Sequence, residues 1–126
     1  MISCFEDLDI WQGSTKLAIS IYTVCREGAM RKEWSLNDQM KRAALSIPSN
    51  IAEGFERGSA GDFRRFLSIA KASCGELRTQ LYIASELNFI TKEKFAELSA
   101  ECLRLSAMIA SLIIRIDERK TKTGKG

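Results

Sequence analysis

The sequence of 126 residues contains no histidine, and this absence removes most of the common catalytic and metal-binding arrangements. A di-iron centre in a helical bundle needs Glu-x-x-His pairs on facing helices, and a Ser-His or Cys-His nucleophile needs a histidine as its base. The sequence also has no glycine-rich phosphate-binding loop and no dinucleotide-binding fingerprint. The sequence therefore argues against an enzyme, and it predicts no metal and no cofactor.

Long apolar runs are also missing. No stretch of about 18 uncharged apolar residues is present, and the N-terminal MISCFEDLDIWQ is acidic where a secretory signal is basic. We therefore expect a cytoplasmic protein that has no membrane partner. The four cysteines, Cys4, Cys25, Cys74 and Cys102, are widely spaced and form no Cys-x-x-Cys pair, so we expect free thiols in a reducing compartment.

Proline is scarce, and the single one, Pro48, lies within a segment that has helical spacing. Apolar residues recur from Leu36 to Phe55 on both sides of Pro48 without a change of phase. A proline inside a helix costs about 3 kcal/mol and bends the helix axis. The spacing therefore predicts a helix that is kinked at Pro48 rather than broken there.

Apolar residues recur along four segments in alternating steps of three and four, which is typical of packed helices. Ser-x-x-acid patterns at Ser35 and Ser59, and Thr91 before the last segment, predict helix caps. Short connections favour antiparallel neighbours. We therefore predict an all-α, up-down-up-down antiparallel four-helix bundle in residues 1–118, with helices near 7–29, 36–57, 60–88 and 92–118. The residues expected in its core are Ile10, Leu17, Ile21, Met40, Ile47, Ile51, Leu67, Leu77, Leu81, Leu98, Leu105, Ile109 and Leu112.

The positive charge is concentrated at the C-terminal end. The whole chain has a formal net charge of +3, but cations and acids nearly balance over residues 1–118, and residues 119–126 hold cations without any acid. We expect this segment to be a disordered basic tail. Its deletion should lower any affinity for nucleic acid without changing the fold or the assembly.

The sequence resembles the family of 23S rRNA-intervening-sequence proteins, from Phe5 to about Ile116. The resemblance is carried by SIPSNIAEGFERGS and by the segment FRRFLSIAKASCGELRTQLYIASELNFI that follows. Ala72-Ser73 stand where members of this family often have Gly-Ser. The residues that match the family pattern are Ser46, Ile47, Pro48, Asn50, Ile51, Ala52, Glu53, Gly54, Arg57, Phe66, Leu67, Ala70, Glu76, Leu77, Gln80 and Leu81.

Several apolar residues fall outside the four seams and indicate a homo-oligomer, namely Trp11, Tyr22, Ile69, Tyr82, Leu103 and Ile114. The resemblance sharpens this expectation to a pentameric ring. The family's encoding within ribosomal RNA intervening sequences, and its likeness to the accessory protein of diversity-generating retroelements, imply binding of RNA or DNA. The alternative is a scaffold that binds an unidentified protein.

Two groups of residues are candidate sites. The first is the face that carries the family motif, which has a structural reading and a recognition reading: Asn50, Glu53, Gly54, Arg57, Glu76 and Gln80. In the structural reading, Asn50 satisfies the backbone group freed by Pro48, and Glu53 and Arg57 form an i, i+4 ion pair. The second group consists of cations that either coat solvated helix faces or contact phosphates: Lys41, Arg42, Arg64, Arg65, Lys71, Arg78, Arg119, Lys120, Lys122 and Lys125.

Overall fold

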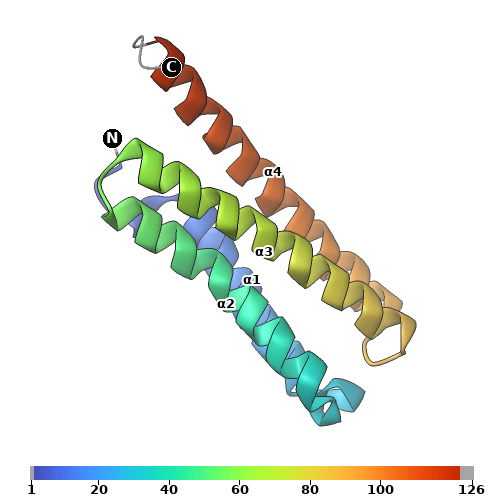
Figure 1. Ribbon diagram of the computed structural model, residues 1–126. Helices are drawn as coiled ribbons and strands as arrows, with labels where there is room; N and C mark the ends of the chain where they lie inside the picture. Colours follow the sequence, from blue (N-terminus) through green and yellow to red (C-terminus); the bar gives the residue numbers. More distant parts are fainter. Residues whose placement is uncertain (1, 123–126) are drawn as a thin grey trace.

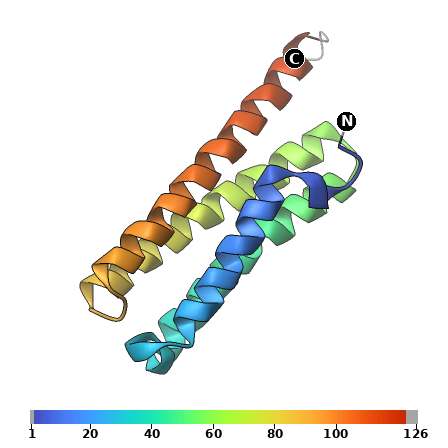
Figure 2. The same ribbon diagram turned by 180° about the vertical axis from the view of Figure 1, so that it is seen from behind.

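The computed structural model describes residues 2–122, which form four long α-helices and two short 3-10 helices. No strand occurs in this part of the chain. The predicted all-α four-helix bundle is confirmed, and Figures 1 and 2 show consecutive helices running in opposite directions. The elements are η1 (Phe5–Asp7), α1 (Asp9–Cys25), η2 (Gly28–Lys32), α2 (Trp34–Glu56), α3 (Ala60–Glu86) and α4 (Lys92–Lys122).

The core is the one that the apolar spacing predicts, with one exception. Every predicted core residue is buried except Leu112, which is half-buried. α2 packs closely against α3, and α3 against α4, but α1 makes few contacts with α4. The C-terminal part of α4 extends past the other helices (Figure 1), so Leu112 lacks a full set of neighbours.

The first predicted helix, 7–29, is divided in the structure. α1 ends at Cys25, and Gly28 has a φ of 51° where η2 begins. The side-chain amide of Asn37 donates to the backbone carbonyls of Cys25 (2.6 Å) and Met30 (3.2 Å). These hydrogen bonds satisfy a carbonyl that the end of α1 leaves open, so the chain turns here instead of continuing as one helix.

The second helix begins two residues earlier than predicted, at Trp34, and the predicted Ser35 cap is wrong. No side chain caps α2, and the carboxylate of Asp38 instead pairs with Arg42 at 2.8 Å. The helix continues through Pro48 to Glu56 without a break. The kink at Pro48 stays a prediction.

The other two predicted caps are confirmed. Ser59 Oγ accepts a hydrogen bond from the amide of Asp62 (3.2 Å), and Thr91 Oγ1 accepts one from the amide of Lys94 (3.0 Å). α3 ends at Glu86, two residues before the predicted end, in a turn where Asn88 has a φ of 61°. This left-handed residue allows the chain to reverse into α4.

The predicted boundary between the bundle and a disordered tail at residue 119 is wrong for residues 119–122, because α4 continues to Lys122. Arginine and lysine are good helix formers, and cations near the C-terminus of a helix interact favourably with its dipole. Residues 123–126, including Lys125, lie outside the described residues. None of the described helices combines the length and the apolar character needed to cross a membrane.

Candidate functional site

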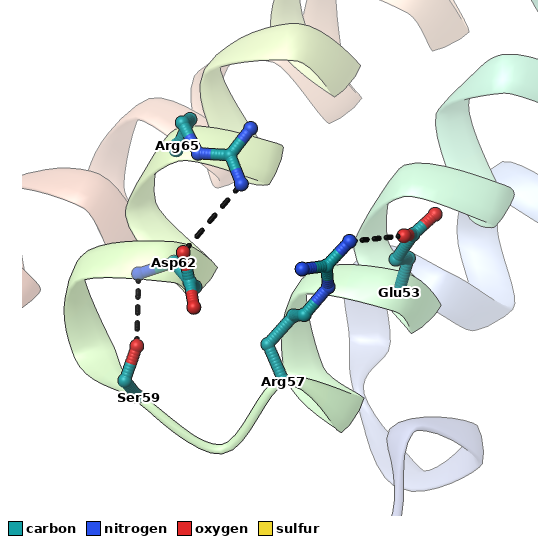
Figure 3. Close-up of polar contacts among 5 residues, drawn as sticks. All are labelled: Glu53, Arg57, Ser59, Asp62 and Arg65. Carbon is teal, nitrogen blue, oxygen red and sulfur yellow. Dashed lines mark hydrogen bonds and ion pairs between the residues drawn. The ribbon is translucent and has the colours of Figure 1, made fainter.

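The first part of the predicted motif face lies at the corner between α2 and α3 (Figure 3). Arg57 Nη2 lies 2.8 Å from Glu53 Oε2, which confirms the predicted i, i+4 pair. This hydrogen bond raises the pKa of the Arg57 guanidinium. Across the corner, Arg65 Nη2 lies 3.5 Å from Asp62 Oδ1, next to the Ser59 cap. Each arginine at this corner therefore has a carboxylate of its own.

The two arginines also share the ring of Phe66, a buried residue of α3. The guanidinium carbons lie 5.1 Å (Arg57) and 4.5 Å (Arg65) from the ring centroid, within the range of cation–π interactions. Gly54 allows the backbone of α2 to lie close to Phe66, because a Cβ at position 54 would stand 2.6 Å from the Cβ of Phe66. The glycine and the arginine of the motif therefore serve the packing of α2 on α3.

Asn50 lies further along the same seam. Its side-chain amide donates to the carbonyl (2.7 Å) and the hydroxyl (2.9 Å) of Ser46, and Ser73 Oγ donates to the same hydroxyl (2.9 Å). The expectation that Asn50 satisfies the group freed by Pro48 is wrong. That group is the carbonyl of Ala44, which lies four residues before Pro48, and Asn50 binds a carbonyl half a turn further along α2.

Glu76 and Gln80 do not face the corner. They line a shallow cavity of about 480 Å³ between α2 and α3, together with Gln39, Arg42 and Ser46. The Oε1 atom of Gln80 is buried and has no hydrogen-bond partner among the described residues. The structure thus divides the predicted face into an ion-paired corner and a polar cavity, with Ser46 contributing to both the seam and the cavity.

The structure separates the predicted cations by their partners. Arg42 pairs with Asp38, Arg65 pairs with Asp62, and Arg64 binds both carboxylate oxygens of Asp117 on α4, with a shortest distance of 2.6 Å. The charges of these three arginines are compensated locally, although exposed pairs of this kind contribute little to stability.

Three of the other predicted cations, Lys41, Lys71 and Arg78, have no carboxylate partner within residues 2–122. Lys41 Nζ lies 5.3 Å from the ring centroid of Tyr22, and Lys71 and Arg78 are exposed without a hydrogen bond or ion pair within residues 2–122. Arg119 and Lys120 border a cavity of about 510 Å³ between the start of α3 and the end of α4. The side chain of Lys122 is outside the described residues.

Sequence reasoning predicted a connection between the first two helices but missed the role of Asn37 and the cleft beside it. Asn37 is 8% exposed and fixes the turn through its two hydrogen bonds, while Trp34, Arg26 and Arg31 line an open cleft beside it. In the sequence, Asn37 stands out as a polar residue within the apolar seam, three residues before Met40. The signal for the cleft was a tryptophan within a charged connection.

The cysteines and the acidic residues are candidate nucleophiles and metal ligands. Within it, no group of three or more histidine, cysteine, aspartate or glutamate side chains is arranged to hold a metal ion. All four cysteines are free. Burial raises the pKa of Cys74 to about 11 and that of Cys102 to about 12, so both remain neutral thiols at physiological pH and are poor nucleophiles.

These features define an all-α bundle protein in which Gly54 and Arg57 of the motif lie against Phe66 at the α2–α3 corner, while Glu76 and Gln80 line a cavity. The sequence matches the 23S rRNA-intervening sequence protein family over residues 6–111, and the chain belongs to that family. Its fold is similar to that of a protein of unknown function from the S23 ribosomal protein family of Bacteroides thetaiotaomicron, with a TM-score of 0.76. That similarity has 24% sequence identity and covers 82% of this chain and 97% of the other. Comparison with curated proteins finds no match.

Proposed function

We propose that this chain is a non-catalytic module that assembles with copies of itself into a pentameric ring and binds nucleic acid. The observation that carries the proposal is a second apolar face on α4, on the side opposite the core. Ala96, Leu103, Ala107, Ala110 and Ile114 recur there at spacings of three, four and seven residues. Leu103 is 52% and Ile114 is 57% exposed. A helix that is apolar on two sides is typical of one that packs against two neighbours.

The nucleic-acid part of the proposal rests on the cations that have no acidic partner. Lys71 and Arg78 are exposed on α3 at a spacing of seven residues, so they lie on one side of the helix. Phosphate backbones attract such side chains without any sequence code. An assembly repeats them in every copy, and this multivalency strengthens a weak single contact. The family's name, which refers to 23S rRNA, points in the same direction.

The assembly is tested by sedimentation or light scattering at micromolar concentration. We expect a mass of five chains for the natural protein and a lower mass for Leu103→Glu, because a buried charge on the second face opposes association. Ala72→Glu adds the same charge to an exposed position of α3 and is the matched control. A stable monomer under these conditions would falsify the ring.

Binding is tested with labelled RNA and DNA over a range of salt concentrations. We expect affinity to fall steeply as salt rises, and the double variant Lys71→Gln, Arg78→Gln to have lower affinity and a shallower salt dependence. Arg42→Gln removes an exposed but ion-paired cation and is the control. Binding of neither RNA nor DNA at low salt would favour the protein-scaffold alternative, in which a protein partner binds the face of Asn50, Glu53 and Arg57.

The C-terminal cations need a separate variant. Since residues 119–122 continue α4, deletion would shorten that helix, so the sharper change replaces the cations of residues 119–126 with glutamine. A lower affinity with an unchanged mass would support their contribution. Unchanged affinity would remove them from the proposal.

A further inference from the structure

Trp34 stands at the start of α2 without the packing that an indole normally receives. It is 82% exposed, more than any other large apolar side chain of the described residues. The second tryptophan, Trp11, is half-buried and lies against the ring of Phe5, with 5.4 Å between centroids. The core therefore accounts for Trp11 but gives no reason for the position of Trp34.

Trp34 borders an open cleft of about 650 Å³ at the α1–α2 turn. Most of the charged residues that line this cleft are cations. Arg26, Arg31 and Lys41 contribute to its walls. Neither Arg26 nor Arg31 has an ion-pair partner within residues 2–122. The one acid in the lining, Asp38, is bound to Arg42.

Lys41 connects the cleft to a second aromatic ring. Its Nζ lies 5.3 Å from the ring centroid of Tyr22, which is also partly exposed. An ammonium group held over a ring keeps its charge and remains able to contact an anion. The cleft and the surface next to it therefore hold both cations and aromatic rings.

Hydrogen bonds within the protein hold the base of the cleft in place. The side chain of Asn37 ties the carbonyls of Cys25 and Met30 together, and Met30 is fully buried in the core. A surface that is already ordered loses less conformational freedom on binding. The cleft is thus a preformed site rather than a loosely held loop.

We propose that this cleft binds single-stranded nucleic acid, with one base stacked on the indole of Trp34 and the flanking phosphates contacting Arg26, Arg31 and Lys41. Unpaired bases expose flat faces that stack on aromatic side chains, and a cationic groove follows their backbone. A duplex hides those faces within its own stack. The inference rests on the proposed function and adds to it the strand form that is bound and the residues that bind it.

The test uses the fluorescence of Trp34 itself. In the Trp11→Phe variant, Trp34 is the only tryptophan, so all of the indole emission reports on the cleft. We expect a short oligouridylate to quench this emission, and the same strand annealed to oligoadenylate to quench it much less at equal phosphate concentration. Equal quenching by the duplex would overturn the proposal.

Trp34→Ala gives the second measurement, by fluorescence anisotropy of the labelled oligouridylate. Because Trp34 is exposed, this variant should keep the circular dichroism spectrum of the natural protein. We expect a loss of affinity of roughly 5- to 150-fold, the equivalent of about 1–3 kcal/mol for one stacked base. Trp34→Phe should restore part of it, and Tyr82→Ala, which removes an exposed ring from α3, should leave it unchanged.

The outcomes separate this inference from the proposed function. Binding that does not change in Trp34→Ala would overturn the stacking site and leave nucleic-acid binding in place at other cations. Absence of any binding would overturn both. A shift of Trp34 emission to shorter wavelength as protein concentration rises, without nucleic acid, would show that a second copy covers the cleft and would also overturn the inference.

Discussion

The two connections that flank α2 are built in different ways. At the α2–α3 corner, Arg57 binds Glu53 and also lies over the ring of Phe66, and Gly54 lets the backbone of α2 come close to Phe66. At the α1–α2 turn, one buried side chain, Asn37, holds the backbone. Around it, Arg26, Arg31 and Trp34 are exposed, and neither arginine has an acidic partner within residues 2–122.

This difference separates what the family motif specifies from what it leaves open. The residues that carry the resemblance include Gly54 and Arg57, which lie against Phe66 where α2 packs on α3. A motif of this kind specifies a fold more firmly than a ligand. The cleft at the α1–α2 turn, in contrast, is lined by residues outside the motif.

The largest effect that tests this comparison is expected at Gly54. Gly54→Ala should lower the free energy of unfolding by about 3 kcal/mol, because the new Cβ overlaps the Cβ of Phe66 and forces α2 and α3 apart. Gly75→Ala is the control, since a Cβ meets nothing there, and it should stabilise the protein by about 0.5–1 kcal/mol. Urea unfolding followed by circular dichroism measures both, and equal effects would contradict the close packing at the corner.

The second effect is expected at the turn. Asn37→Ala should cost about 2 kcal/mol, because it leaves the buried carbonyl of Cys25 without its donor. Asn50→Ala should cost about 1 kcal/mol or less, because the Ser46 carbonyl lies inside α2 and has a backbone donor in the helix. The same urea unfolding compares them. A larger loss at Asn50 would mean that the motif asparagine, not the turn, is the more important buried amide.

Cysteine labelling distinguishes local opening of the turn from general loosening. Cys25 is buried beside Asn37, and burial raises the pKa of its thiol, so a thiol reagent should modify it slowly. Asn37→Ala should speed the labelling of Cys25 several-fold while Cys74 and Cys102 stay protected, as mass spectrometry of the labelled peptides would show. Gly54→Ala should not single out Cys25, since it acts at the other end of α2. Equal acceleration at all three cysteines would indicate global unfolding instead.

The sequence was sufficient for the bundle because helix packing repeats locally. Leu67 and Leu77 belong to the apolar series of α3, and Leu105 belongs to that of α4. All three are buried, because an apolar series with the period of a helix lies on one face of it. The caps at Ser59 and Thr91 also depend on residues only three positions apart. The predicted cap at Ser35 failed because η2 leads directly into α2 at Trp34.

The parts that failed depend on contacts between distant residues. Asn37 reaches back across the whole turn to Cys25, and the approach of Gly54 to Phe66 depends on how α2 crosses α3. Neither is visible in local spacing. The same limit explains why the motif face was predicted as one surface, since only the three-dimensional structure separates Glu76 and Gln80 from Arg57.

The smallest effect is expected at the Arg64–Asp117 pair, which joins α3 to the end of α4 near the corner. Arg64 donates to both carboxylate oxygens of Asp117, at 2.6 and 3.1 Å, and lowers the pKa of this carboxyl below its usual 3.8. Both side chains are about half exposed, so solvent screens the interaction and its contribution to stability is small.

The direction of its pH dependence follows from the lowered pKa. A carboxyl whose pKa is lower in the folded state stabilises the fold above its unfolded pKa, and this contribution is lost as pH falls through the folded value. Asp117→Asn should therefore lower the melting temperature slightly at neutral pH, and the difference from the natural protein should vanish well below pH 3.8. Glu118→Gln removes the same charge from the next residue, which has no ion pair within residues 2–122, and should change little at either pH. A difference for Asp117→Asn that persists unchanged in acid would mean that the carboxyl acts through packing rather than through its charge.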